Sequence, residues 1–130
     1  MESETIATPS APQAIGPYSQ GKRVGELIFT AAQVAIDPNT PGKLVPGGIR
    51  EQTAQVMHNL SAILEAAGSR LSDTVKTTVF VVDLSEFAAL NEVYGQFFQQ
   101  SPPARSTVQV AALPLGARVA IDVIAAVSVR

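Results

Sequence analysis

The residue that most clearly offers chemistry is an arginine at the start of an apolar, alternating segment. Arg105 lies in residues 103–110, PARSTVQV. Strand side chains alternate between two faces, so Thr107 shares a face with Arg105 while Ser106 and Val108 point the other way. A guanidinium stays charged at any working pH, and its planar fork of donors matches a carboxylate or phosphate. The segment therefore predicts a site for a small anion, with a salt-bridged or surface arginine as the alternative.

Other kinds of catalytic group are scarce in this chain. It has no cysteine, which excludes disulfides, thiolate nucleophiles, zinc-thiolate sites and iron–sulfur clusters. The single histidine, His58, is expected on the surface of a predicted helix. No Ser–His–Asp triad can be read, and Gly47 and Gly48 lack the Lys and Ser or Thr of a phosphate-binding loop.

Length and composition predict one domain that associates with other subunits. The chain has 130 residues, 46% of them hydrophobic and 15% charged, and its mean hydropathy is +0.21. A domain of this size buries a single core without disulfides or metal ions. So apolar a composition predicts that part of the surface is covered by a partner subunit.

Charge and hydropathy patterns disfavour nucleic acid and membrane as partners. The formal net charge is −2 and the pI is about 5.3, and Lys and Arg do not cluster, so a row of phosphates would not be neutralised. Residues 1–10 lack the positively charged start and apolar core of a signal peptide, and no apolar run reaches membrane-spanning length. We expect a soluble, cytoplasmic protein.

The first half of the chain predicts strands followed by a long helix. Two or three short strands are expected in residues 5–26, and residues 27–35 read as a strand that ends in a turn cluster at 37–42. Apolar residues then recur at spacings of three and four, which predicts an amphipathic helix over about 48–67 with Gly68 as its C-cap.

The second half predicts a buried strand, another helix and a final hairpin. Residues 74–82, TVKTTVFVV, are rich in β-branched side chains and read as a strand. A helix follows, with Asp83 as its cap and Glu86 three residues later to complete a capping box. The Arg105 strand and a long strand over 118–129 are then expected to pair antiparallel across the turn at 113–116.

These elements predict an α+β fold with both helices on one face of a mixed sheet. The opposite face is then left open. It is expected to be apolar, through Val108, Val110, Val119, Ile121 and Val123 or through their neighbours of opposite parity. A partner subunit is the natural cover for such a face.

Several segments, in order along nearly the whole chain, closely resemble the Rid family, the reactive intermediate deaminases also called YjgF-like proteins. These segments are residues 14–20 (AIGPYSQ), 29–33 (FTAAQ), 75–87 (VKTTVFVVDLSEF), Asn91 and 103–106 (PARS). The resemblance implies a chorismate-mutase-like α+β subunit in a homotrimer, with the sheets around a central barrel and the sites in clefts between subunits. It also implies hydrolysis of 2-aminoacrylate, 2-iminopropanoate or 2-iminobutanoate to 2-keto acids and ammonia without metal or organic cofactor.

The same resemblance implies roles for individual residues. Arg105 matches the arginine that holds the substrate carboxylate, and the remaining matches line the cleft: Tyr18, Asn91, Thr107 and the backbone at Ala31 and Ala32. Tyr18 has an alternative interpretation as a packing aromatic with a satisfied hydroxyl. Asn91 has one as a helix-surface amide.

The chain departs from the family pattern at four positions. Relatives with deaminase activity commonly have Ser and Gly where this chain has Ala31 and Ala32, Cys in place of Thr107, and a water-activating Glu in place of Ala120. Asp122 lies on the same side of the predicted strand as Ala120, about 6–7 Å further along. Asp122 is therefore our candidate for the missing carboxylate, with an ion pair to Arg118 or to another subunit as the alternative.

Three functions remain open from the sequence. The first is an imine or enamine deaminase with a small carboxylate substrate, whose activity is reduced or shifted in substrate because Ala120 replaces the family Glu. The second is a noncatalytic protein of the same fold that binds a small carboxylate such as 2-oxobutanoate as a sensor or regulator. The third is a ribonuclease, which the acidic charge balance disfavours.

Overall fold

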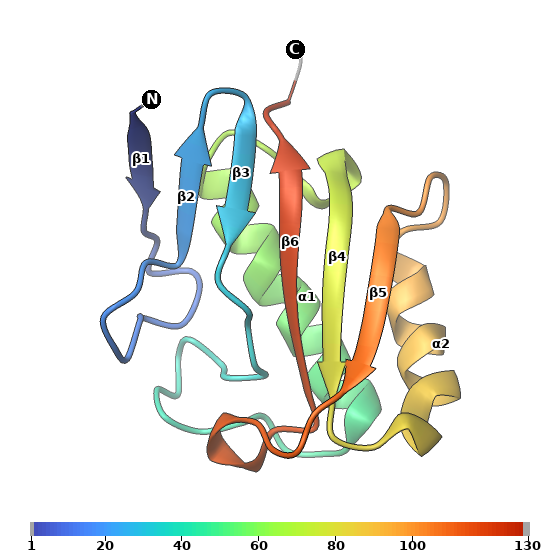
Figure 1. Cartoon of the computed structure of the whole chain (residues 1–130). Coiled ribbons are helices and arrows are strands. Elements are labelled where there is room, and N and C mark those ends of the chain that lie inside the picture. The colour runs from blue at the N-terminus through green and yellow to red at the C-terminus, as the bar shows by residue number, and fades with distance from the viewer. Residues whose placement is uncertain (1, 129–130) are drawn as a thin grey trace.

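The protein is a six-stranded mixed sheet with two helices packed on one face, as predicted (Figure 1). The computed structural model describes residues 2–128. The elements follow in the order β1 (Ser3–Ile6), β2 (Gly21–Val24), β3 (Leu27–Thr30), α1 (Ile49–Ala66), β4 (Thr74–Val81), α2 (Phe87–Phe97), β5 (Ala104–Gln109) and β6 (Val119–Ala126). Short 3₁₀ turns precede three of them, at Leu71–Asp73, Leu84–Glu86 and Pro114–Gly116.

The last strand, β6, lies in the middle of the sheet. The strand order is β1-β2-β3-β6-β4-β5, and β6 pairs antiparallel with both β3 and β4 (Figure 1). β6 therefore has a strand on each side. Its sequence, VAIDVIAA, is largely apolar, and most of its residues are buried.

The predicted hairpin between the Arg105 strand and the final strand is wrong. β5 pairs with β4, and the two strands are parallel. Helix α2 connects them, and a helical crossover brings the chain back to start a parallel strand rather than an antiparallel one. β5 therefore lies at the edge of the sheet, separated from β6 by β4.

Side chains of alternate parity on β6 divide the molecule into a core and an open face. Val119, Ile121 and Val123 point toward the helices and are at most 2% exposed, so the open face is formed by their neighbours of opposite parity. On it lie Leu27, Phe29 and Val108, all substantially exposed. This face also carries Phe80, Ala120 and Ile124 with four polar residues, Lys76, Thr78, Ser106 and Asp122, which follow from the strand registers.

The helices form where the sequence predicts them, with one difference at their N-termini. At α1 the Glu51 carboxylate accepts a hydrogen bond from Gly48 N–H at 2.7 Å, and Gly68 follows the helix with a φ of 82°. Asp83 caps the 3₁₀ turn before α2 by accepting from Ser85 N–H. Glu86 does not complete the predicted capping box, because its carboxylate pairs with Arg118.

Within residues 2–128, neither helix is long and apolar enough to cross a membrane. Over the same residues, no three His, Asp or Glu side chains gather as metal ligands.

Candidate functional site

The Arg105 guanidinium is held in a cradle formed by α2. In the β4–β5 register Arg105 lies opposite Thr77, and both side chains face α2. One Arg105 nitrogen donates a hydrogen bond to Asn91 Oδ1 at 2.8 Å. The guanidinium carbon lies 5.2 Å from the ring centre of Phe87 and 4.8 Å from that of Tyr94. Aromatic faces attract a cation electrostatically and fix the plane of its fork.

No carboxylate within residues 2–128 neutralises Arg105. The ion pairs found there join Arg50 to Glu92, Arg70 to Asp73 and Arg118 to Glu86. The positive charge of the guanidinium is therefore not compensated by a carboxylate of the described chain, and most of its N–H donors are available to an external group. A half-buried, oriented arginine of this kind is suited to bind a carboxylate bidentately. The salt-bridged alternative for Arg105 is not what the structure shows.

Tyr94 fixes the position of α2 against the sheet. Its hydroxyl forms a buried 2.8 Å hydrogen bond with Thr77 Oγ1. Burial raises the pKa of Tyr94, while the Thr77 hydrogen bond and the Arg105 charge act in the opposite direction. The phenol therefore stays protonated at neutral pH. The sequence analysis did not identify the contact of Tyr94 and Phe87 with Arg105.

Thr107 lies two residues beyond Arg105 on the same face of β5, opposite Val79 of β4. It is half-buried. The strand rise places its Cα about 6.6 Å from that of Arg105, so it extends the same surface along the edge of the sheet.

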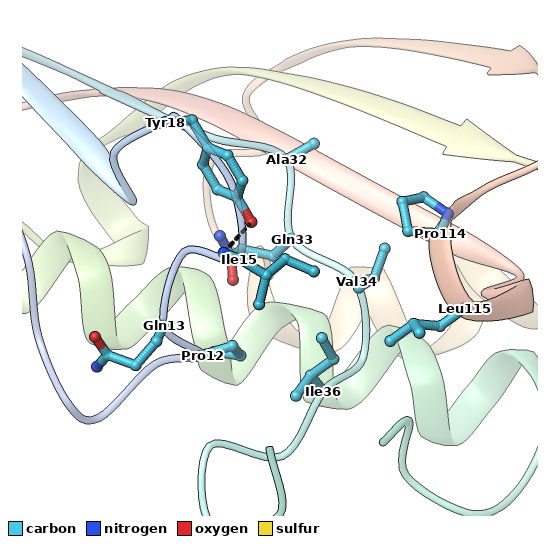
Figure 2. A pocket seen from close by; sticks show the side chains of 10 residues that line it. All are labelled: Pro12, Gln13, Ile15, Tyr18, Ala32, Gln33, Val34, Ile36, Pro114 and Leu115. Carbon is cyan, nitrogen blue, oxygen red and sulfur yellow. Dashed lines mark hydrogen bonds between the residues drawn. The ribbon is translucent and has the colours of Figure 1, made fainter. Parts of the chain in front are cut away.

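Tyr18 and Ala32 lie together at a second location, on the wall of a small cavity (Figure 2). The cavity measures about 80 Å³. The Tyr18 hydroxyl accepts a hydrogen bond from Ile15 N–H at 3.3 Å, and half of the side chain remains exposed. The lining residues are mainly apolar and carry no charge: Pro12, Gln13, Ile15, Tyr18, Ala32, Gln33, Val34, Ile36, Pro114 and Leu115.

The chain leaves the regular sheet at Ala31 and Ala32. Ala31 N–H donates to Gln20 C=O at 2.8 Å, and Gln33 exchanges two backbone hydrogen bonds with Ile121. The strand expected over 27–35 therefore ends at Thr30, with an isolated bridge at Gln33. Between these anchors, the exposed Ala32 N–H finds no backbone acceptor in the described chain. Ala32, rather than Ala31, offers the free backbone donor.

A buried glutamine holds the loop that carries Tyr18. The Gln20 side chain accepts from Thr8 N–H at 2.7 Å and donates to the carbonyls of Thr8, Ala11 and Pro12. Only 4% of Gln20 is exposed. The Gln20 amide thus provides hydrogen-bond partners for backbone groups of a loop that has no strand pairing to satisfy them.

A second buried amide holds the opposite wall of the cavity. Asn59 of α1 donates to the carbonyls of Val34 and Ile36 at 3.2 and 2.9 Å. The sequence analysis assigned no role to Gln20 or Asn59. A signal was available for Asn59, because it is a polar residue within the apolar stripe of a predicted helix.

The Arg105 cradle and the cavity are far apart within one chain. The loop after β3 is separated from β5 by the two intervening strands β6 and β4, which corresponds to about 14 Å across the sheet. In the sheet register Arg105 lies level with Thr77 of β4 and Val123 of β6, so it is the intervening strands that separate the two groups. A substrate of amino-acid size extends about 3.5 Å along its backbone. It cannot contact both groups in a single chain.

Ala120 and Asp122 form a third location, on the open face of the sheet. Asp122 lies opposite Thr78 and Ala120 opposite Phe80, so neither shares a face with Arg105 in the same chain. The ion pair of Asp122 with Arg118 is not formed, because Arg118 binds Glu86. Burial raises the pKa of Asp122, and the Thr78 hydroxyl and the Lys76 charge oppose that shift.

Comparisons with known proteins agree with this fold over nearly the whole chain. The sequence model of the family described as Endoribonuclease L-PSP matches residues 8–127. A RutC family protein of Pyrococcus abyssi is 50% identical over 96% of this chain and 98% of its own. The mouse 2-iminobutanoate/2-iminopropanoate deaminase is 49% identical over 94% of this chain and 90% of its own.

A solved structure shows a similar protein with a ligand. The crystal structure of E. coli TdcF with bound serine superposes with a TM-score of 0.91 and 44% sequence identity. The match covers 96% of this chain and 99% of that one.

We predict that replacing Gln20 with leucine loosens the Tyr18 loop. The change leaves the Thr8 N–H and several carbonyls without partners, which costs about 1–3 kcal/mol in the free energy of unfolding. Urea denaturation and hydrogen exchange at the Thr8 amide measure the effect. Gln99→Leu, at an exposed glutamine with one local hydrogen bond to Gln96, is the control. Unchanged stability and unchanged Thr8 protection would show that Gln20 does not hold the loop.

A second prediction concerns the pH dependence of stability. The pKa of Asp122 is raised from 3.8 in the folded protein, so its stabilising contribution is present below that value and is lost as pH rises through the folded pKa. Asp122→Asn should therefore raise the Tm at pH 7 relative to the parent, and less so at pH 3.5. The pKa of Asp83 is lowered, so Asp83→Asn should instead lower the Tm at pH 7. Thermal scans across pH measure both variants. If Asp122→Asn lowers the Tm at pH 7, as Asp83→Asn is expected to do, the raised pKa of Asp122 is contradicted.

Proposed function

Because the chain belongs to the Endoribonuclease L-PSP family, the family of Rid or YjgF-like proteins, we propose that it hydrolyses small carboxylate-bearing imines and enamines. This substrate class includes 2-aminoacrylate, 2-iminopropanoate and 2-iminobutanoate, and the products are 2-keto acids and ammonia. The observation that carries this proposal is Arg105, an oriented guanidinium with no carboxylate partner in the described chain.

Two comparisons support this substrate class. The mouse relative is named for the deamination of 2-iminobutanoate and 2-iminopropanoate. The TdcF crystal structure contains serine, which carries a carboxylate on the carbon that bears nitrogen. An imino acid has the same carboxylate and differs at that carbon, so the Arg105 fork suits both.

In the proposed reaction the protein mainly positions the substrate and contributes few reactive groups. Arg105 binds the carboxylate and holds the C=N carbon in place, and the Ala32 N–H can donate to the same carboxylate. An enamine such as 2-aminoacrylate first becomes its imine by moving a proton from nitrogen to the CH₂ carbon. Water then attacks the C=N carbon and gives up a proton, and the nitrogen takes one up. The resulting carbinolamine loses ammonia as its C–N bond breaks and the C=O bond of the keto acid forms.

Asp122 is the carboxylate we assign to the attacking water. Because it lies on the sheet face opposite Arg105 of its own chain, it is assigned to act with Arg105 of a neighbouring subunit. A carboxylate whose pKa is raised accepts a proton more readily than an ordinary one. Tyr18, Asn91 and Thr107 complete the assigned site as residues that line it.

The proposed assembly is a homotrimer with the site between subunits. One chain keeps Arg105 and Asn91 apart from Tyr18 and Ala32, so a shared cleft needs two copies. The open sheet face carries exposed Leu27, Phe29 and Val108, which association would remove from water. Packing these faces around a common axis forms a central barrel.

Two alternatives remain as competing proposals. A noncatalytic binding protein is favoured by one observation, that Ala120 has no side-chain group able to accept a proton. A ribonuclease would agree with the description of the matching family, but the net charge of −2 gives no basic surface for RNA.

We predict that Arg105→Lys strongly lowers imine turnover. Lysine keeps the charge but loses the two-pronged contact, so kcat/KM should fall roughly tenfold to a thousandfold, about 1.5–4 kcal/mol. The assay generates the imine with an amino-acid oxidase and follows its loss by semicarbazone trapping. Arg50→Lys, at an exposed ion pair, is the matched control.

The same assay separates deamination from binding alone. A parent protein no faster than buffer, with keto-acid binding that depends on Arg105, supports the binding protein. Arg105→Lys and Arg105→Ala variants that both match the parent would eliminate the carboxylate clamp.

A further prediction tests whether the site is shared between subunits. Arg105→Ala and Tyr18→Ala should each be impaired alone. Unfolding them together and refolding the mixture should restore activity, because random mixing puts an intact pair at roughly one quarter of the interfaces of a symmetric oligomer. Light scattering checks that parent and mixture have the mass of a trimer. A monomer mass, or no recovery in a correctly assembled mixture, would contradict the shared site.

A further inference from the structure

Leu115 has a backbone conformation that leucine rarely adopts. Its φ is 61° and its ψ is 16°, and it is the only residue other than glycine with a positive φ in the described part of the chain. This left-handed region costs an L-residue with a Cβ atom about 1–2 kcal/mol. Glycine or asparagine would adopt it more readily.

Core packing does not account for leucine at this position. Leu115 is 52% exposed and contributes nothing to the buried core. A large apolar side chain that is both exposed and conformationally strained is consistent with a functional role more than with stability.

The Leu115 side chain lies on the wall of the cavity that Tyr18 and Ala32 also line (Figure 2). Ile15, 71% exposed, lines the same cavity from the Tyr18 loop. Val34 and Ile36 line it from the segment after β3. Three segments distant in the sequence thus surround one space with branched apolar side chains.

The size of this space suits a short apolar group. One water needs about 10–15 Å³ of such a volume, so 80 Å³ has room for several water-sized groups. A branched four-carbon side chain is of this size. No charged residue lines the cavity, so a charged group would lose its hydration without gaining a partner.

We propose that Leu115, together with Ile15, forms the pocket for the substrate side chain and selects branched apolar imino acids and 2-keto acids over those with a methyl group. The inference rests on the proposed function, because Tyr18 and Ala32 are assigned there to the reacting end of the substrate. The pocket then receives the other end. The preferred substrate is the imine derived from leucine, ahead of 2-iminopropanoate.

Replacing Leu115 with asparagine tests the pocket without disturbing the backbone, because asparagine tolerates the left-handed region. The kcat/KM for the leucine-derived imine should fall roughly tenfold, the lower end for a lost hydrophobic contact. That for 2-iminopropanoate should change less than about twofold. Leu115→Met keeps apolar bulk and should retain the selectivity. Val75→Thr, at an exposed apolar residue outside the cavity lining, is the control.

A binding measurement gives an answer that does not depend on turnover. Calorimetric titration compares 4-methyl-2-oxopentanoate with pyruvate, the keto-acid products of the two imines. The parent should prefer the branched acid about tenfold, and Leu115→Asn should abolish that preference.

The outcomes separate the pocket from the catalytic proposal. If the parent turns over no imine but shows the Leu115-dependent preference in binding, deamination fails and the pocket stands. If imines are turned over but Leu115→Asn keeps the parent's selectivity, the pocket is wrong and deamination stands. If the parent neither turns over an imine nor binds either keto acid, both are wrong.

Discussion

The pairing of β6 with two neighbours at once is the constraint on which the rest of this structure depends. This strand is the last one in the sequence, and it joins β1, β2 and β3 to β4 and β5. Its residues of one parity, Val119, Ile121 and Val123, enter the core under the helices, while Ala120 and Asp122 lie on the other face. Because β6 occupies the centre, β5 is left at the edge. There the Arg105 side chain meets α2 and remains accessible to a ligand.

The alternation of side chains along strands also determines how the functional groups are distributed. Arg105 faces the helices and Asp122 faces away from them, and no rotation of a side chain moves either through the sheet. Tyr18 and Ala32 lie beyond two further strands. One chain therefore contains the parts of a carboxylate site without assembling them. This is the physical reason for placing the proposed reaction between subunits.

Buried side-chain amides give the irregular segments the order that the sheet cannot supply. Gln20 holds the loop before β2, Asn59 holds the segment after β3, and Gln52 accepts from Arg118 N–H at the entrance to β6. Breaking one of these contacts leaves a buried polar group unpaired, which costs more than the hydrogen bond contributes. The cavity walls are thereby held in one arrangement although they contain little regular structure.

Local patterns in the sequence determined the elements and much of the chemistry, and tertiary structure decided their partners. The spacing of apolar residues predicted α1 to within one residue at each end, and the alternation in residues 103–110 showed which side chains share a face with Arg105. The motifs spread along the chain identified the family. None of these patterns specifies which strand lies beside β5, because pairing depends on contacts between distant segments, and the predicted hairpin was wrong for that reason. The left-handed backbone conformation of Leu115 could not be predicted from the sequence either, since leucine has no local preference for it and only the surrounding fold imposes it.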